Sequence, residues 1–222
     1  MAQTKSKTHT KYRTAAGEIV PSVTTVISQN LGWNTRALMA WSRKMGAEGQ
    51  DPNKVRDAAA DVGTLAHYHI MQHVKGEPLD DAYVSEFSVQ DGQMALTCLQ
   101  RYLEWASTVG LEPVSSELGL VDEVCKVGGT IDMLATIQGA NALVDFKTSK
   151  GVYADHVVQV AAYRHMVMHE RDVDIPAVYL VRLPKDGADF EVHRYGPAVL
   201  DDAYEVFAHL RAIHDLQGRV RA

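Results

Sequence analysis

The sequence Gly129-Thr130-Ile131-Asp132 is followed, thirteen residues after its aspartate, by Asp145-Phe146-Lys147-Thr148-Ser149. The second stretch contains the only Asp/Glu-x-Lys triplet in the chain and ends an apolar run that is typical of a β-strand. One such triplet carries little information by itself. The first stretch adds another carboxylate, and its spacing along the sequence suits a β-hairpin. Both acids and the lysine are therefore predicted to lie on neighbouring strands.

Segments 130–137 and 142–148 are rich in apolar and β-branched residues, and a turn-like Gln-Gly-Ala-Asn separates them. Because alternate side chains share one face of a strand, Asp145 and Lys147 should point the same way, roughly 6.6 Å apart. A loop of two or four residues centred on Gly139-Ala140 would place Asp132 opposite Lys147 on that face. A three-residue loop without a bulge would turn Asp132 to the other face. The alternative to a site is a solvated polar face.

Two helical segments carry further polar side chains. Segment 54–74 has a helical pattern in which His67 shares a face with apolar residues, so its imidazole should point inward. An inward histidine is more often a hydrogen-bonded core residue than a ligand. On a second predicted helix, 153–170, Gln159 and Tyr163 are four residues apart and lie together; the alternative is an ordinary amphipathic helix.

The combined order of these motifs, Gly-Thr-x-x-His, Gly-x-x-Asp, Asp-x-Lys-Thr-Ser and Gln-x-x-x-Tyr, is more specific than any one of them. It resembles the RecB-like branch of the PD-(D/E)XK nuclease superfamily, which includes phage exonucleases and the mitochondrial genome maintenance exonuclease. The segment Pro21-Ser22-Val23-Thr24 is similar to the opening of the phage and mitochondrial members. The resemblance covers about Pro21 to Tyr163.

The resemblance implies a role for each matching residue. The helical histidine and the two aspartates would bind a divalent metal, and the lysine would assist the attacking water. In this chain they are His67, Asp132, Asp145 and Lys147, and the carbonyl of Phe146 would complete the metal ligands. Contacts to nucleic acid would come from the motif residues and one basic helix residue: Gln159, Tyr163, Ser22, Thr24 and Arg36.

Glu117, on a strand-like segment, is a further candidate ligand. Several relatives carry an acid on the first core strand near a second metal, and Glu117 should face away from Leu118 and Leu120. The alternative is an exposed strand glutamate. Oxygen ligands with one imidazole favour Mg²⁺ or Mn²⁺. Cys98 and Cys125 are the only cysteines, which suits free thiols and rules out a four-cysteine iron–sulfur cluster.

Composition sets limits on the class of protein. The chain has 222 residues and 46% hydrophobic residues, enough for one domain with a sizeable core. It has no long apolar run typical of a membrane span and no signal-like start, so we expect a cytoplasmic protein of a bacterium or phage-infected cell. The net charge of −6 argues against sequence-blind coating of duplex DNA. A local basic arm with Lys5, Lys7, Lys11 and Arg13 is either a DNA contact or a solubilising tail.

The expected architecture is α/β: a restriction-endonuclease-like core with a mixed sheet flanked by helices and a helical N-terminal part. Residues 1–15 are predicted to be a flexible arm and 16–222 a single domain. Within that domain, 16–110 should be mainly helical, 111–198 should form the sheet with the 153–170 helix, and 199–217 should be a closing helix.

The sequence therefore predicts a Mg²⁺- or Mn²⁺-dependent deoxyribonuclease, an exonuclease acting on DNA ends or single strands in recombination, repair or replication. The preference for exonuclease rests on the resemblance alone. A structure-specific endonuclease and a non-catalytic nucleic-acid-binding subunit remain alternatives. A recombination or replication protein is a candidate partner.

Overall fold

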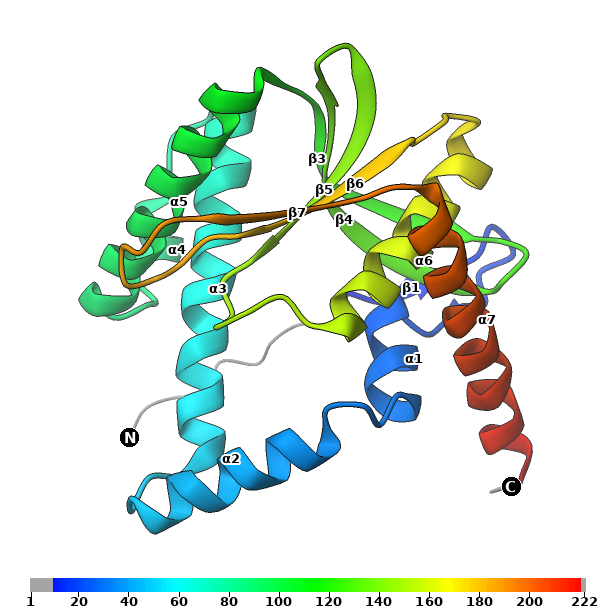
Figure 1. The fold of residues 1–222 in the computed structure, drawn as a ribbon, viewed down its shortest axis with the longest axis horizontal. Coiled ribbons are helices and arrows are strands. Elements are labelled where there is room, and N and C mark those ends of the chain that lie inside the picture. Colours follow the sequence, from blue (N-terminus) through cyan, green and yellow to red (C-terminus); the bar gives the residue numbers. More distant parts are fainter. Residues whose placement is uncertain (1–9, 221–222) are drawn as a thin grey trace.

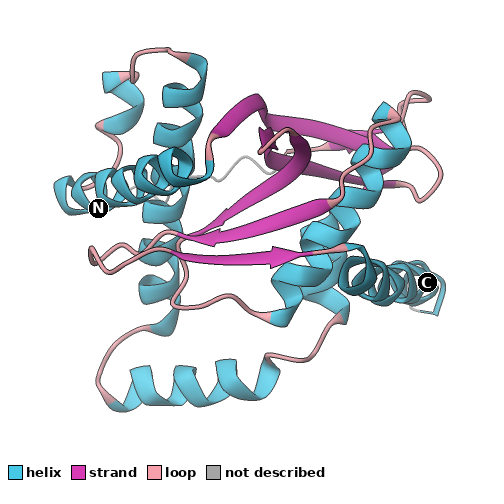
Figure 2. Ribbon diagram, turned by 45° about the horizontal axis from the view of Figure 1, so that its top comes forward, coloured by secondary structure: helices cyan, strands magenta, loops and turns pink. Residues whose placement is uncertain are grey.

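A five-stranded mixed β-sheet forms the centre of the protein in the computed structural model, which describes residues 10–220 (Figure 1, Figure 2). Its strand order is β3–β4–β5–β6–β7, and only the β5–β6 pair is parallel. Parallel neighbours need a long crossover, which the helix α6 supplies. The strands are β3 (Leu111–Asp122), β4 (Val127–Ile137), β5 (Ala140–Lys147), β6 (Ala177–Arg182) and β7 (Glu191–Tyr195).

Helices cover both faces of this sheet. One apolar core packs α1, α6 and α7 against one face, and the other packs α3 and α5 against the opposite face. This arrangement confirms the predicted mixed α/β core. The helices are α1 (Val23–Asn30), α2 (Thr35–Ala47), α3 (Pro52–Lys75), α4 (Asp81–Val84), α5 (Val89–Val109), α6 (Ala154–Arg171) and α7 (Pro197–Val220).

The helix ends follow local capping chemistry. Ser22 caps α1 because its hydroxyl accepts the N–H of Thr25. Asp51 caps α3, which starts at Pro52 and ends at Lys75, and Gly76 follows as a C-cap in the left-handed conformation. Asn34 precedes α2 but makes no side-chain capping hydrogen bond.

Helix α2 lies apart from both cores. Figure 1 shows it linking α1 to α3 across the lower edge of the molecule, and none of its residues is buried. Trp33, just before it, is also exposed. No helix between residues 10 and 220 is both long and apolar enough to cross a membrane.

The end of the predicted N-terminal arm belongs to the folded domain. The short strand β1 (Tyr12–Arg13) pairs with β2 (Ile19–Val20), and the Tyr12 hydroxyl lies 2.8 Å from Oγ1 of Thr130 in β4. Gly128 makes room for this ring, since a Cβ there would lie 2.1 Å from Cγ of Tyr12. Residues 12–15 are therefore not a free arm, whereas Lys5 and Lys7 lie outside the described residues.

The β4–β5 hairpin turns one residue earlier than the sequence predicted. Its loop is Gln138-Gly139, and both residues have positive φ, as a tight two-residue hairpin turn requires. The loop length is even, so Asp132 keeps the predicted face. The pairing runs up to Met133 and Val144. If this register is continued by one residue beyond Met133 and Val144, Asp132 lies level with Asp145. The prediction that Asp132 lies opposite Lys147 is therefore wrong.

Candidate functional site

The two acids and the lysine meet at the C-terminal end of β5. Asp145 has a buried side chain, and its Oδ2 lies 2.8 Å from Nζ of Lys147. The backbone N–H of Phe146 donates a 2.8 Å hydrogen bond to Oδ2 of Asp132 on β4. This hydrogen bond connects Asp132 on β4 to the residue that follows Asp145 on β5.

His67 reaches this cluster from α3. Its Nε2 lies 3.1 Å from the carbonyl oxygen of Phe146, and its Nδ1 lies 3.4 Å from Oδ1 of Asp132. Gly63 lets the helix come this close, because a Cβ there would lie 3.0 Å from Oγ1 of Thr148. The structure thus brings together the four side chains that the sequence singled out, with the Phe146 carbonyl between them.

A chain of polar contacts extends from Lys147 along α6. Nζ of Lys147 donates a 3.0 Å hydrogen bond to Oε1 of Gln159, and Nε2 of Gln159 donates a 3.2 Å bond to the Tyr163 hydroxyl. The Tyr163 ring packs directly on Gly129, where a Cβ would lie 2.5 Å from the ring. Gly129, Tyr163 and Gln159 therefore form one set of contacts that positions Lys147.

We expect the substitution Gly129→Ala to displace Tyr163 and loosen Lys147. Overpacking of this kind costs about 1–3 kcal/mol of stability, and cleavage should fall as well. Urea unfolding followed by circular dichroism, together with an activity assay, measures both effects. Gly119→Ala on the neighbouring strand is the matched control, because a Cβ at Gly119 meets nothing within 4 Å. Equal stability of the two variants would contradict this account.

Glu117 joins the site through an unusual backbone. It lies between the pairs Ser116–Met133 and Leu118–Ile131, at the level of Asp132 but without a regular pairing to it, and its φ is +50°. Next to it β4 changes face: Ile131 packs in the α6 and α7 core, whereas Met133 packs in the α3 and α5 core. Residues two apart normally share a face, so the regular alternation of side chains along β4 is broken at Asp132.

Two adjoining hollows meet at His67 and Asp132. One, of about 340 Å³, contains Lys147, Asp145, Gln159 and Tyr163. The other, of about 550 Å³, contains Glu117 together with aromatic and apolar side chains of α3 and α4. Glu117 and Lys147 therefore lie in different hollows that both include His67 and Asp132.

Some lining residues were missed by sequence reasoning. His156 lies in the first hollow, as do Thr130 and Ser149. The signal for His156 was present, since positions 156, 159 and 163 share one face of α6. Burial and the nearby Lys147 lower the pKa of His156 to about 4, so its ring is neutral near pH 7.

The remaining predicted contact residues lie outside the two hollows. Ser22 and Thr24 border a separate pocket of about 270 Å³ beside β1 and β2. Ser22 also makes a bridge to Gly128 on β4, which connects that pocket to the strand of Asp132. Arg36 is exposed on α2.

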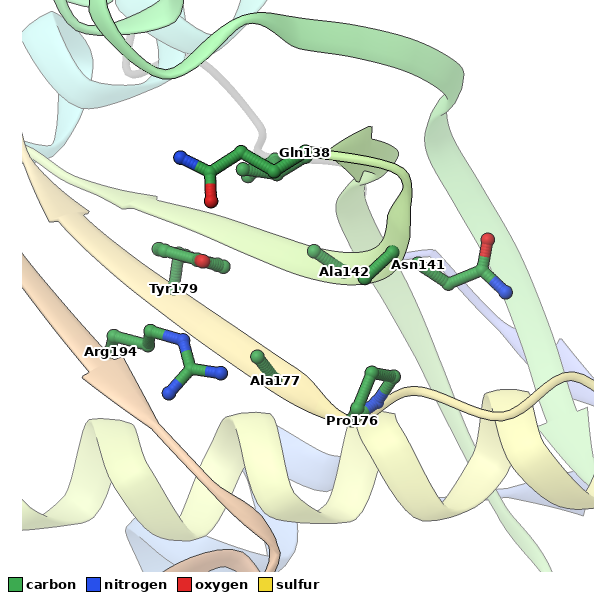
Figure 3. A pocket seen from close by; sticks show the side chains of 9 residues that line it. Gln138, Asn141, Ala142, Pro176, Ala177, Tyr179 and Arg194 are labelled. Atoms are coloured by element: carbon green, nitrogen blue, oxygen red, sulfur yellow. The ribbon is translucent and has the colours of Figure 1, made fainter.

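Another pocket, of about 440 Å³, lies at the opposite end of the sheet around the β4–β5 turn (Figure 3). Figure 3 shows Tyr179 and Arg194 beside Gln138 and Ala177, and none of the motif residues is among those that line it. Arg194 is the one charged residue in that set, within the described part of the chain. This pocket lacks the acids and the lysine that make the first site reactive.

Comparison with known families agrees with the site geometry. The family model of the PD-(D/E)XK nuclease superfamily matches residues 36–219, which include all four clustered side chains. The chain belongs to the PD-(D/E)XK nuclease superfamily. The superfamily is named for nucleases, which are hydrolases that act on nucleic acid.

Solved structures with a similar fold include two exonucleases. A candidate exonuclease from Eubacterium rectale is 15% identical, with a TM-score of 0.48, and the match covers 67% of this chain and 64% of that protein. LHK-Exo in complex with dAMP is 14% identical, with a TM-score of 0.40, and the match covers 74% of this chain and 87% of LHK-Exo. This chain thus spans less than two thirds of the first of these proteins. A search of curated proteins found no match.

The donor set of this PD-(D/E)XK site suits a hard divalent cation. Ligand atoms of His67, Glu117 and Asp132 lie within 4.8 Å of one another. The Phe146 carbonyl lies beside His67, while Asp145 directs one oxygen to Lys147. Carboxylates, a carbonyl and one imidazole match the preferences of Mg²⁺ and Mn²⁺.

The charges of the cluster shift its pKa values strongly. Burial opposes the charged form of His67, but Asp132, Asp145 and Glu117 outweigh it and raise the pKa of His67 to about 9. Burial raises the pKa of Asp145 to about 6, and the charge of Asp132 adds to this shift. Glu117 is exposed on β3, but desolvation by its neighbours and the charge of Asp132 raise its pKa to about 6 as well. Burial also disfavours the charged form of Asp132, yet His67, Lys147 and the Phe146 N–H together lower its pKa. In the metal-free protein, the positive charge of a protonated His67 balances negative charge on the neighbouring carboxylates.

Proposed function

We propose that this chain is a metal-dependent DNA exonuclease of the RecB-like branch, which hydrolyses phosphodiester bonds at ends or on single strands. The observation that carries this proposal is the contact of Lys147 with Asp145, next to Asp132 and His67. A lysine paired to a buried acid at a metal-binding cluster has few structural uses, because the pair could be replaced by apolar residues at little cost.

Mg²⁺ or Mn²⁺ would be held by Asp132, Asp145, His67 and the carbonyl of Phe146, with Glu117 as a further ligand near His67 and Asp132. When bound, such an ion polarises the scissile phosphate and lowers the pKa of a coordinated water. To ligate the ion, His67 must give up the proton that it holds in the metal-free protein, because only a neutral imidazole nitrogen has a free lone pair.

Lys147 would orient the attacking water and stabilise negative charge that develops on the phosphate. The contacts to Asp145 and Gln159 hold its ammonium at 2.8 Å and 3.0 Å, so little reorganisation is needed during the reaction. Gln159 and Tyr163, together with Ser22, Thr24 and Arg36, would contact the DNA strand. A chain of net charge −6 would bind through this local surface and not through bulk attraction.

The test is a cleavage assay with Mg²⁺ or Mn²⁺ on single- and double-stranded oligonucleotides labelled at the 5′ or the 3′ end, alongside a circular single strand. We expect stepwise release of short products from free ends, no cleavage of the circle, and no activity in the Asp145→Asn variant. Cleavage of the circle would identify an endonuclease. Binding without turnover in both metals would identify a non-catalytic subunit and overturn the proposal.

The titration of His67 and the acids gives a pH dependence for metal binding. Protons compete with the metal for His67 up to a pH of about 9 and for Asp145 and Glu117 up to about 6. The apparent affinity for Mn²⁺ should therefore rise from about pH 6 to about pH 9, with proton release on binding. Isothermal titration calorimetry in buffers of different ionisation enthalpy measures both quantities.

The His67→Ala variant is the control for this titration. It should bind Mn²⁺ more weakly, and its affinity should level off above about pH 6 to 7, because only the acids still titrate. An identical pH profile in the two proteins would show that His67 is not a ligand. On the family resemblance, the proposal also includes a role in recombination, repair or replication. It further includes a cytoplasmic location and a partner protein from one of these processes.

A further inference from the structure

A second group of metal-ligating side chains lies at the turn between β3 and β4. It consists of Asp122 at the end of β3, Cys125 in the turn and His165 on α6. One ligand atom from each residue lies within 4.8 Å of the other two. None of the three lines the hollows of the nuclease site.

Asp122 presents a fixed carboxylate oxygen to this group. The side chain is buried, and its Oδ1 accepts the backbone N–H groups of Val124 at 2.9 Å and Cys125 at 2.7 Å. Its Oδ2 lies 3.9 Å from Nε2 of His165, which is too far for a hydrogen bond. Two backbone donors thus fix the carboxylate while Oδ2 remains directed at the imidazole.

The other two ligands are held by α7. The His165 ring stacks on Tyr204 with a centroid distance of 3.8 Å, and the Tyr204 hydroxyl lies 3.5 Å from Sγ of Cys125. Arg211 donates to the carbonyl oxygens of Cys125 at 3.0 Å and Lys126 at 3.1 Å, which fixes the turn. Neighbours that orient the ligands are a feature of metal centres, because they reduce the reorganisation needed for binding.

We propose that Asp122, Cys125 and His165 bind Zn²⁺ or a similar borderline-soft cation. Thiolate, imidazole and carboxylate are all ligands of zinc, and three of them leave a fourth position for water. The carboxylate and the thiolate carry two negative charges, which balance the two charges of the cation. Binding releases the thiol proton of Cys125 to solvent, and no electron is transferred.

Sulfur separates this cluster from the nuclease site. The thiolate favours zinc over Mg²⁺, whereas the oxygen ligands at Asp132 and Asp145 favour the harder ion. A cation at Asp122 would tie the β3–β4 turn to α6, beside the α7 residues Tyr204 and Arg211. It would therefore stabilise the fold on the sheet face opposite α3 and α5, without contacting the reacting groups.

Cobalt(II) provides a direct test, because a thiolate ligand to cobalt gives a charge-transfer band in the near ultraviolet. The reduced wild-type protein is titrated with Co²⁺ in excess Mg²⁺, which occupies the nuclease site. We expect one thiolate-bound cobalt per chain, no band in Cys125→Ser, and an unchanged band in Cys98→Ala and Asp132→Asn. Cys98 is the matched control, since its thiol is buried and donates to the Leu183 carbonyl.

A second measurement uses Zn²⁺ and does not depend on cleavage. Competition with a chromophoric chelator should show Zn²⁺ bound at least about tenfold more weakly in Cys125→Ser and His165→Gln than in wild type. Zn²⁺ should raise the melting temperature of the wild type and of Asp145→Asn, but not of these two variants. A wild type without the cobalt band, or a band and zinc affinity retained in Cys125→Ser, would overturn the proposal.

Discussion

Replacing Lys147 with alanine is expected to lower the rate of phosphodiester cleavage by about 10²- to 10³-fold, a loss typical for a donor aimed at charge in the transition state. Nζ of Lys147 lies 2.8 Å from Asp145 and 3.0 Å from Gln159, so the structure holds this ammonium at the edge of the predicted metal cluster. The single-turnover rate on a labelled single strand, with saturating Mn²⁺, measures the loss without interference from product release.

Lys150→Ala is the matched control, because Lys150 is exposed in the loop that follows and should keep wild-type rates. The Lys147→Ala protein must also be checked for folding, since its loss leaves the buried Asp145 without its cation. Asp145 can respond by protonation, because burial already raises its pKa to about 6. A folded Lys147→Ala protein with full activity would refute the site assignment.

Asp132→Asn is expected to weaken Mn²⁺ binding by about 100-fold and to remove cleavage at physiological metal concentrations. The carboxylate faces His67 with one oxygen and accepts the Phe146 N–H with the other, so it joins the helix ligand to the β5 ligands. The amide keeps the shape of the side chain and can keep the hydrogen bond, which limits the change to charge and ligand strength. Calorimetric titration with Mn²⁺ measures the affinity.

Asp202→Asn on α7 removes the same charge from an exposed position and should leave the Mn²⁺ affinity unchanged. The pKa of His67 provides an independent readout, since Asp132 is the charge that raises it most. In Asp132→Asn the histidine should titrate well below pH 9, as seen by NMR of the imidazole protons. Wild-type Mn²⁺ affinity together with an unshifted histidine would show that Asp132 is not part of the cluster.

The sequence predicted those parts of the site that depend on local periodicity. Strand alternation placed Asp145 and Lys147 together, and helical spacing paired Gln159 with Tyr163 and turned His67 inward. The hairpin was predicted with the correct parity but with its turn one residue late, because Gln138 adopts a positive φ that its residue type does not announce. The error leaves every side chain on its face, which is why the predicted cluster forms.

Other features depend on contacts between distant parts of the chain. The two-residue strand at Tyr12 has no periodic pattern, and its docking on Gly128 is visible only when β4 is in place. The group of Asp122, Cys125 and His165 likewise draws on a turn and a helix separated by about forty residues. Composition and spacing give no means of pairing such segments without the fold.

The left-handed backbone at Glu117 restricts which residues evolution can sample there. Asparagine, aspartate and glycine tolerate this conformation, whereas valine or isoleucine would be destabilised by about 1–2 kcal/mol. Position 117 therefore has two requirements, a residue that tolerates a positive φ and a carboxylate that can bind a metal. In a saturation library at this codon, aspartate meets both requirements, whereas glycine meets only the first. Growth or survival selections on such a library would rank the two independently of any metal titration.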